Sequence, residues 1–514
     1  MKTRHLSIIL TILALAIPQL ALATPLDDYV AAPDSNYSYS VVNTLTGPGY
    51  KAYVLNMTSQ SWRKPGEVDR TLWQHWLTII KPDAATANTA LLWITGGNNT
   101  SPAPTSADLM IVGIALGTNT VVAELRMVPN QPLIFPDGGG PRYEDAIIAY
   151  SFNKCLETND PNWPALFPMA KSAVRAMDTI QKHISSAAAG NLKIDQFVVS
   201  GASKRGWTTW LTAAVDHRVI AIAPVVIDVL NMAEQMKHHY SAYGFYSPSI
   251  HDYVQYKIFD RLNTPAGQKL RTFVDPYEYR SRYTMPKYGI NSSGDQFFLP
   301  DSAQFYFKDM LGEKYLRYVP NTDHGLGGSD APLSLLAFYK SILAGSQRPK
   351  FSWSVAEDGA ITVQTTTAPT AVNLWQATNP NARDFRLETI GPVWKSSPLE
   401  KQPDGTYVAK VTKPEKGWTA YFIEMTFDSG GPIPYKFTTE VRVVPDLLPF
   451  AYKLGFDTDC DLDFADLAIL AVHWLSGEPC VDVAPICGDG HVNFLDYALF
   501  AAEWRYGKEF TTLN

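Results

Sequence analysis

The sequence predicts an α/β fold built on a doubly wound, mostly parallel sheet, followed by a β-rich segment and a short acidic tail. Through residues 24–348, apolar runs rich in β-branched residues alternate with helix-like runs, a pattern typical of a sheet covered on both faces. Residues 349–445 carry short alternating runs separated by turn signals. Residues 451–514 hold eight Asp and three Glu against three Lys or Arg, so the tail is a separate acidic unit.

The first 23 residues predict a secretory signal peptide. They begin with the basic residues Lys2 and Arg4, continue with an apolar run over 6–17, and end in small residues at 21–23. This pattern places cleavage before Thr24 and predicts a secreted or periplasmic protein. A membrane span needs about 20 apolar residues, so the run is too short and we expect no span.

The α/β segment has a regular series of strand and helix candidates. The strand candidates are 90–95, 120–125, 196–199, 220–227, 288–291 and 315–319, and the helix candidates are 143–152, 168–184, 207–215 and 333–344. An insertion at about 229–285, rich in Tyr, Phe and His, interrupts the series. We interpret it as a cap over the site; the alternative is a helical excursion with ordinary packing aromatics.

The β-rich segment 349–445 predicts a small antiparallel β-sandwich. Turn signals such as Pro-Asp-Gly at 403–405 separate its apolar runs. The segment carries no obvious catalytic constellation. Its runs are 351–355, 361–365, 371–375, 407–410, 420–426 and 437–444.

Ser203 has the surroundings of a nucleophile elbow, the sharp turn that presents a catalytic serine. It lies in Ser-Gly-Ala-Ser-Lys-Arg-Gly-Trp at 200–207, after the apolar run 196–199 and before a helix-like run. Small neighbours permit the turn, and the unpaired N–H groups of the next helix point at a developing oxyanion. The alternative is a serine that only caps the helix.

Two backbone N–H groups are the predicted oxyanion hole. One belongs to Lys204, directly after the nucleophile, and the other to Gly97 in the loop after the apolar run 91–94. A plain Gly-Gly turn is the alternative for that loop. Arg205 occupies the place where such elbows usually have glycine, and Gly206 follows one position later. We expect the side chains of Lys204 and Arg205 to face solvent, with an acidic substrate group as the alternative partner.

The nucleophile of a doubly wound hydrolase is followed along the chain by an acid and then by a histidine. Asp295 lies in a small-residue loop after one late strand candidate, and His324 follows the next with glycines beside it. We therefore predict a catalytic triad of Ser203, Asp295 and His324, which needs no cofactor. Asp301 and Asp228 remain alternatives for the acid.

Four stretches together resemble the PhoPQ-activated pathogenicity-related protein family. They are Gly-Ala-Ser-Lys-Arg-Gly-Trp-Thr-Thr-Trp at 201–210, Ile-Thr-Gly-Gly-Asn-Asn at 94–99, Val-Pro-Asn-Gln-Pro-Leu at 128–133 and Asp-His-Gly at 323–325. The resemblance covers about residues 25–445. It implies an exported protein with an α/β-hydrolase fold and a Ser-Asp-His site, and it leaves the substrate open.

The tail contains a 30-residue repeat, in which an acidic loop leads into an amphipathic helix. Alternating Asp and Asn side chains supply the oxygen ligands that Ca²⁺ prefers. The repeat resembles a dockerin module with structural Ca²⁺, which implies a cohesin-type partner; the alternative is a helical pair pinned by disulfides without metal. We expect calcium at the first loop, while Pro485 and Cys487 replace ligands in the second. The predicted ligands are Asp457, Asp459, Asp461, Asp463, Asp466, Asp489, Asn493 and Asp496.

The leading hypothesis is a secreted serine hydrolase that cleaves an ester or amide through an acyl-enzyme and is tethered by its tail. Its substrate would be a small molecule, a carbohydrate ester or a peptide. The rival hypothesis is a non-catalytic secreted signalling or adhesion protein on a hydrolase scaffold. Outside the tail the chain is close to neutral, which argues against a nucleic-acid partner.

Overall fold

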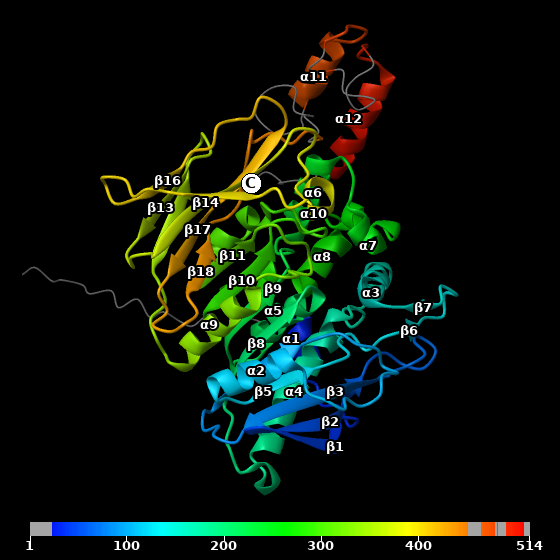
Figure 1. Cartoon of the computed structure of the whole chain (residues 1–514). Helices are drawn as coiled ribbons and strands as arrows, with labels where there is room; N and C mark the ends of the chain where they lie inside the picture. Colours follow the sequence, from blue (N-terminus) through cyan, green and yellow to red (C-terminus); the bar gives the residue numbers. More distant parts are fainter. Residues whose placement is uncertain (1–22, 451–463, 479–480, 482–489, 508–514) are drawn as a thin grey trace, which may run out of the picture.

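The computed structural model describes residues 23–450, 464–478, 481 and 490–507 (Figure 1). The predicted signal peptide, except its last residue, lies outside the described residues. So do the predicted calcium ligands Asp457, Asp459, Asp461, Asp463 and Asp489. In the part of the chain that is described, no helix has the length and apolar character to cross a membrane.

The described helices and strands follow one another in a mixed α/β order. The strands are β1 (Ser38–Gly47), β2 (Tyr50–Ser61), β3 (Leu72–Pro82), β4 (Thr89–Ile94), β5 (Val122–Leu125), β6 (Leu133–Ile134), β7 (Pro141–Arg142), β8 (Gln196–Ala202), β9 (Val219–Val225), β10 (Lys287–Ser292), β11 (Lys314–Val319), β12 (Phe351–Val355), β13 (Ile361–Thr365), β14 (Ala371–Asn379), β15 (Lys395–Pro398), β16 (Tyr407–Ala409), β17 (Trp418–Phe427), β18 (Tyr435–Thr438) and β19 (Arg442–Val444). The α-helices are α1 (Pro25–Ala31), α2 (Leu109–Thr118), α3 (Glu144–Thr158), α4 (Leu166–Ile184), α5 (Lys204–Val215), α6 (Met232–Tyr243), α7 (His251–Gln255), α8 (Pro265–Val274), α9 (Ala331–Leu343), α10 (Leu387–Ile390), α11 (Phe464–Val472) and α12 (Phe494–Gly507).

A 14-stranded sheet runs through the molecule, and its parallel centre positions the site. The strand order is β1-β2-β3-β5-β4-β8-β9-β10-β11, and the strands from β5 to β11 along this path pair in parallel. Helices cover both faces of this sheet. Adjacent residues of a strand point to opposite faces, so two neighbours on one strand belong to two different cores. Leu92 shares a core with α4 and α5, whereas its neighbour Leu91 shares a core with α2 and α9. This doubly wound arrangement is consistent with an α/β-hydrolase.

The antiparallel strands β1 to β3 and the helix α2 were not predicted from the sequence. β1 is exposed on both faces along most of its length, so it lacks the apolar alternation that marks a strand. α2 is apolar on almost every side, so it has no amphipathic period to recognise it by.

The β-rich segment consists of two sheets, one of which continues the main sheet. β18 pairs antiparallel with β11, so β18, β17, β14 and β15 extend the central sheet across the predicted boundary at 349. β12, β13 and β16 form a separate three-stranded sheet. Val363 of the small sheet, Met425 of the large sheet and Phe338 of α9 share one core. The sequence predicted antiparallel strands here but not their union with the parallel sheet.

The insertion between β9 and β10 is helical, and it packs against α3 and the loop after β10. It contains α6, α7 and α8, and its aromatic residues Tyr243 and Tyr253 are buried. The Tyr253 hydroxyl donates to the carboxylate of Asp145, at the start of α3, over 2.9 Å. The aromatic composition therefore serves packing at these two positions.

A buried charge cluster ties this insertion to the β-rich segment. Arg383, in the loop after β14, lies 2.6 Å from the carboxylate of Asp301, and both side chains are 2% exposed. His238 of α6 contacts the same carboxylate oxygen at 2.9 Å. One carboxylate thus joins three segments that are distant along the chain.

The described part of the tail contains α11 and α12, one helix from each repeat. Asp466 and Asp496 occupy equivalent places in their first turns, and both are fully buried. Phe464 and Phe494, which begin the two helices, are both exposed. The repeat read from the sequence therefore corresponds to two similarly placed helices.

Candidate active site

Ser203 follows β8 directly and precedes α5, at a turn that few L-residues adopt. Its φ is +58° and its ψ is −128°, a strained combination that persists only where the surroundings enforce it. Its N–H donates to the carbonyl of Val225 on β9 at 2.8 Å. A Cβ on Gly201 would lie 2.8 Å from the carbonyl oxygen of Arg205, and one on Gly206 would lie 2.6 Å from a side chain just after β9. Gly206, one position later than the glycine of the usual elbow, therefore lets α5 approach β9.

Asp295 and His324 form a hydrogen-bonded pair in the loops after β10 and β11. His324 Nδ1 lies 2.9 Å from Oδ1 and 2.8 Å from Oδ2 of Asp295. Since an ionised carboxylate can only accept, Nδ1 carries the proton and Nε2 is the basic nitrogen. The backbone N–H of Phe297 also donates to Asp295, at 2.7 Å, and this bond helps to hold the carboxylate. Nε2 of His324 is buried and has no hydrogen-bond partner within the described part of the chain.

The three predicted triad residues lie at one edge of the parallel sheet. Ser203, Asp295 and His324 follow β8, β10 and β11, whose carboxyl ends meet at the same edge. Among the described residues no direct hydrogen bond joins Ser203 to His324. Catalytic hydrogen bonds are often long before a substrate binds. The geometry thus pairs the acid with the histidine and places the serine at the same edge.

The two predicted oxyanion donors begin a helix and a glycine loop. Lys204 is the first residue of α5, where a backbone N–H has no acceptor within the helix. Gly97 lies in the loop after β4 with φ +132°, a conformation that L side chains rarely adopt. The N–H of Met127 donates to the carbonyl of Gly96 at 2.9 Å, which ties this loop to the end of β5.

The side chains of Lys204 and Arg205 do not face solvent, contrary to the expectation from the sequence. Lys204 Nζ lies 3.0 Å from a carboxylate oxygen of Glu144 and 3.0 Å from one of Asp145. Arg205 Nη2 donates to the other Glu144 oxygen at 2.6 Å, and its Nε donates to the carbonyl of Val128 at 2.6 Å. Burial acts to raise the pKa of Glu144, but the charges of Lys204 and Arg205 outweigh it and hold that pKa at about 2. Glu144 therefore stays ionised between two cations.

Arg205 joins the turn at Ser203 to the loop that carries Gly97. A Cβ on Gly96 would overlap its guanidinium, so that loop lies directly against the arginine. Gln131 donates to Glu144 at 2.6 Å and accepts the N–H of Glu144 at 2.7 Å, which closes the network on the other side. The sequence reasoning missed Glu144 and Gln131 as supporting residues. The stretch 128–133, which carries part of the family resemblance, was the signal for this network, because it contains Val128 and Gln131.

The two alternative acids have other partners. Asp301 is held by Arg383 and His238, as described above. Asp228 accepts the hydroxyls of Tyr306 at 2.5 Å and Tyr318 at 2.6 Å. Complete burial raises the pKa of Asp228 to about 7, although both tyrosine hydrogen bonds act against this rise. Of the three carboxylates, Asp295 is the one that contacts His324.

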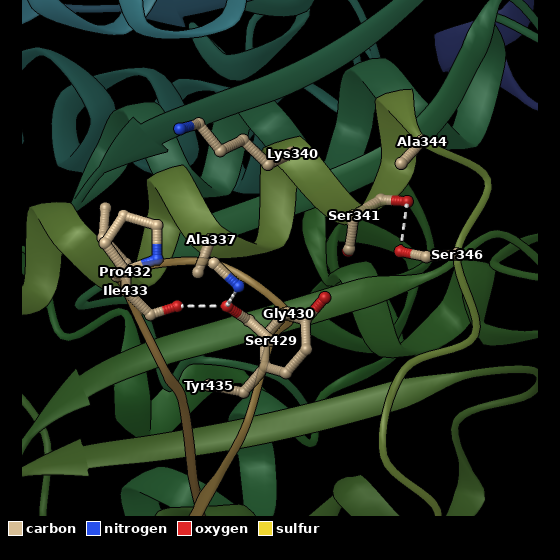
Figure 2. Close-up of a pocket in the computed structure, with 11 residues that line it drawn as sticks. Ala337, Lys340, Ser341, Ala344, Ser346, Ser429, Gly430, Pro432, Ile433 and Tyr435 are labelled. Atoms are coloured by element: carbon tan, nitrogen blue, oxygen red, sulfur yellow. Dashed lines mark hydrogen bonds between the residues drawn. The ribbon is translucent and has the colours of Figure 1, made fainter.

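In the part of the chain that the structure describes, two cavities have linings without Ser203, Asp295 and His324. One, of about 210 Å³, lies between α9 and the loop that joins β17 to β18, and Figure 2 shows Lys340 and Ser341 on its helical wall. None of the predicted site residues lines it. The other, of about 220 Å³, is bounded by Gly96 and Gly97 and therefore lies beside the predicted oxyanion loop.

Solved structures similar to this chain include esterases and a peptidase. Acetyl xylan esterase 1 from Thermoanaerobacterium sp. JW/SL YS485 is 13% identical with a TM-score of 0.43, covering 62% of this chain and 93% of its own. Glucuronoyl esterase from Solibacter usitatus is 17% identical with a TM-score of 0.30, covering 52% and 70%. The acylaminoacyl peptidase of Pyrococcus horikoshii is 10% identical with a TM-score of 0.35, covering 60% and 49%.

Sequence comparison assigns the family directly. The model of the PhoPQ-activated pathogenicity-related protein family matches residues 26–386. Autocrine proliferation repressor protein A of Dictyostelium discoideum is 37% identical over 474 residues, covering 87% of this chain and 95% of that protein. The residues that the family model matches include Gly97, Ser203, Asp295 and His324. The chain therefore belongs to the PhoPQ-activated pathogenicity-related protein family.

Proposed function

We propose that this chain is a serine hydrolase that cleaves an ester or amide through an acyl-enzyme. The observation that carries the proposal is the Asp295–His324 pair, whose free Nε2 lies at the same sheet edge as a serine in a strained elbow. Acid, base and nucleophile also follow one another in the chain order of a doubly wound hydrolase.

The reaction follows from the role of each group. Ser203 Oγ attacks the substrate carbonyl while His324 Nε2 takes its proton, and the N–H groups of Lys204 and Gly97 stabilise the oxyanion. The tetrahedral intermediate expels the alcohol or amine, which receives the proton from His324. Water then attacks the acyl-enzyme while His324 Nε2 takes its proton. That proton passes to Ser203 Oγ as the acid is released. Asp295 holds the imidazole and stabilises its charged form.

A fluorophosphonate probe tests the nucleophile directly. We expect it to label the wild-type chain and to leave Ser203→Ala unlabelled, because the probe reacts only with an activated serine. Ser106→Ala, which removes an exposed serine, is the matched control and keeps full labelling. Equal labelling of wild type and Ser203→Ala would refute the assignment.

Arg205→Met tests whether the arginine positions the oxyanion loop. Without its bonds to Val128 and Glu144, we expect the loop to shift and kcat to fall about 100-fold, since a displacement of about 1 Å can cost that much. KM for a p-nitrophenyl ester changes little, because the substrate still binds. Arg218→Met, which removes an ion-paired arginine between α5 and β9, serves as the control and is expected to keep the wild-type kcat. If Arg205→Met keeps the wild-type kcat, Arg205 has no positioning role.

The second candidate function is a non-catalytic secreted signal. The name of the Dictyostelium relative, a proliferation repressor, favours it. The two proposals differ in one measurement, since turnover of short acyl p-nitrophenyl esters that His324→Ala abolishes excludes a purely non-catalytic protein. A chain without such turnover and without probe labelling supports the signalling role.

We further propose that the chain is exported and that its tail is a calcium-binding, dockerin-like module with a cohesin-type partner. The predicted leader supports export, and the burial of Asp466 and Asp496 at equivalent helix starts supports the repeat. Calcium titration of the chelator-treated full chain by calorimetry is expected to reveal binding that Asp466→Ala weakens at least about tenfold, since a ligand carboxylate is lost. Asp428→Ala, an exposed acid outside the tail, keeps full binding. Absence of calcium uptake by the wild-type chain contradicts the module.

A further inference from the structure

The cavity beside the oxyanion loop has a composition that the triad does not explain. Its volume of about 220 Å³ is smaller than the pockets of about 300–1,000 Å³ that hold drug-sized ligands. It therefore suits a single small ring. Its walls combine Trp76 of β3, Ser101 after the loop, and Glu124 and Arg126 at the end of β5, with Gly96 and Gly97 on the side of the elbow.

A carboxylate and a guanidinium lie side by side in this cavity. Arg126 Nε donates to Glu124 Oε2 at 2.8 Å, and the glutamate is 6% exposed while the arginine side chain is 34% exposed. Burial raises the pKa of Glu124 in spite of the opposing hydrogen bond and charge of Arg126. Thr78, directly across from Glu124 in the β3–β5 register, has a buried hydroxyl without a partner in the described structure. Thr78 lies outside the lining, so the charged groups that the cavity itself offers to a ligand are the Glu124 carboxylate and the Arg126 guanidinium.

The indole of Trp76 supplies an apolar face to the same cavity. Its N–H donates to the carbonyl of Ser101 at 2.9 Å. This bond uses the polar atom of the indole, so what Trp76 offers to a ligand in the cavity is apolar ring surface. Because the face of an aromatic ring is electronegative, it attracts the C–H groups of an aliphatic ring.

The cavity matches a neutral ring that carries adjacent hydroxyls. Of two neighbouring hydroxyl groups, one donates to the Glu124 carboxylate and the next accepts from Arg126, while the ring C–H groups lie on Trp76. An anion is disfavoured because Glu124 repels it, and a cation because Arg126 does. We propose that this cavity is a saccharide subsite that holds one neutral sugar ring beside the oxyanion loop. The inference rests on the proposed hydrolase function and makes carbohydrate esters its substrate class.

Binding is measured apart from turnover, with the full-length Ser203→Ala chain. The probes are methyl β-xyloside and methyl β-glucoside, with tetrahydropyran as the ring without hydroxyls and sodium acetate as the anion, each titrated by NMR saturation transfer. We expect the glycosides to bind, and Glu124→Gln and Trp76→Leu to weaken them at least about tenfold, or about 1.4 kcal/mol. Trp76→Phe keeps a ring face and is expected to retain binding. Trp375→Leu, a partly buried tryptophan of β14, is the matched control and is expected to bind as its parent does.

Three results would overturn the proposal: no glycoside signal, equal binding by parent and Glu124→Gln, or acetate binding more tightly than either glycoside. Circular dichroism of each variant separates lost binding from lost folding, and Glu124→Gln changes the fewest atoms if Trp76→Leu does not fold. Glycoside binding by a chain whose wild type escapes the fluorophosphonate probe supports the subsite and refutes the hydrolase. Labelling without glycoside binding does the reverse.

Discussion

His324→Ala is expected to lower ester turnover by about 10⁴ to 10⁶-fold, the range seen when a triad histidine is removed. The reason is that, among the described residues, Nε2 of His324 is buried without a hydrogen-bond partner at the sheet edge where Ser203 lies, so the substitution removes the proposed acceptor of the Ser203 proton. Asp295→Asn is expected to cost about 10⁴-fold, because an amide that donates to Nδ1 forces the wrong tautomer. The measurement is kcat/KM for a short acyl p-nitrophenyl ester.

Two controls sharpen this expectation. His217→Ala removes an exposed histidine beyond the end of α5 and is expected to keep full activity. The Ser203→Ala, His324→Ala double variant is expected to be no worse than either single variant, because triad members act as one unit. Additive losses, or a His324→Ala chain with more than about a tenth of the wild-type rate, would be incompatible with a shared proton route.

The parallel core was predictable because its strands are continuous apolar runs that alternate along the chain with helix-like runs. In a parallel sheet the carboxyl ends of the strands share one edge. Ser203, Asp295 and His324 each follow such a strand, so they must lie at that edge. Chain order then selected one histidine out of ten. The hydrogen bonds between His324 and Asp295 arise from these two general properties of the sequence rather than from any single motif.

The environment of Arg205 was not predictable, because its partners come from three separate segments. Glu144 begins a helix, Val128 follows β5, and Gly96 follows β4, and nothing local in the sequence joins them. A charged residue in place of the usual glycine suggested an exposed side chain, since unpaired charges are rarely buried. The carboxylate that permits burial is supplied by Glu144, 61 residues earlier in the chain.

The pairing of the β-rich segment with the central sheet could not be predicted from the local sequence pattern either. β11 is buried on both faces, as are central strands, which indicates a neighbouring strand on each edge but not which strand it is. β18 occupies that edge from more than a hundred residues downstream. Asp301, in the loop after β10, contacts both Arg383 of this segment and His238 of α6 and so links the segment to the helical insertion. Both contacts make the β-rich segment part of the hydrolase-like body, and this has a measurable consequence for stability.

Arg383→Met is expected to destabilise the protein by about 3–5 kcal/mol, because it leaves the buried carboxylate of Asp301 without its main partner. Burial alone would raise the pKa of Asp301, but the charges of Arg383 and His238 hold it well below its usual range. In the wild type this contribution is therefore present above the unfolded-state pKa of about 4 and is lost only as the pH falls through the depressed folded value. Urea unfolding at pH 7 measures the difference.

The pH dependence of that difference separates a charge effect from lost packing. In Arg383→Met the charge of the arginine is gone while Asp301 stays buried, so the pKa of Asp301 rises. As the pH falls, protonation of Asp301 removes the cost of its unpaired buried charge. The gap between wild type and variant is then expected to shrink markedly between pH 7 and pH 4, because Asp301 of the variant becomes neutral while the wild-type carboxylate stays ionised and paired with Arg383. Asp301→Asn combined with Arg383→Met is expected to recover much of the loss at pH 7, since no buried charge is left unpaired. A gap that is the same at both pH values, with no recovery in the double variant, would assign the cost to packing of the arginine stem and would remove the carboxylate as the link between the insertion and the β-rich segment.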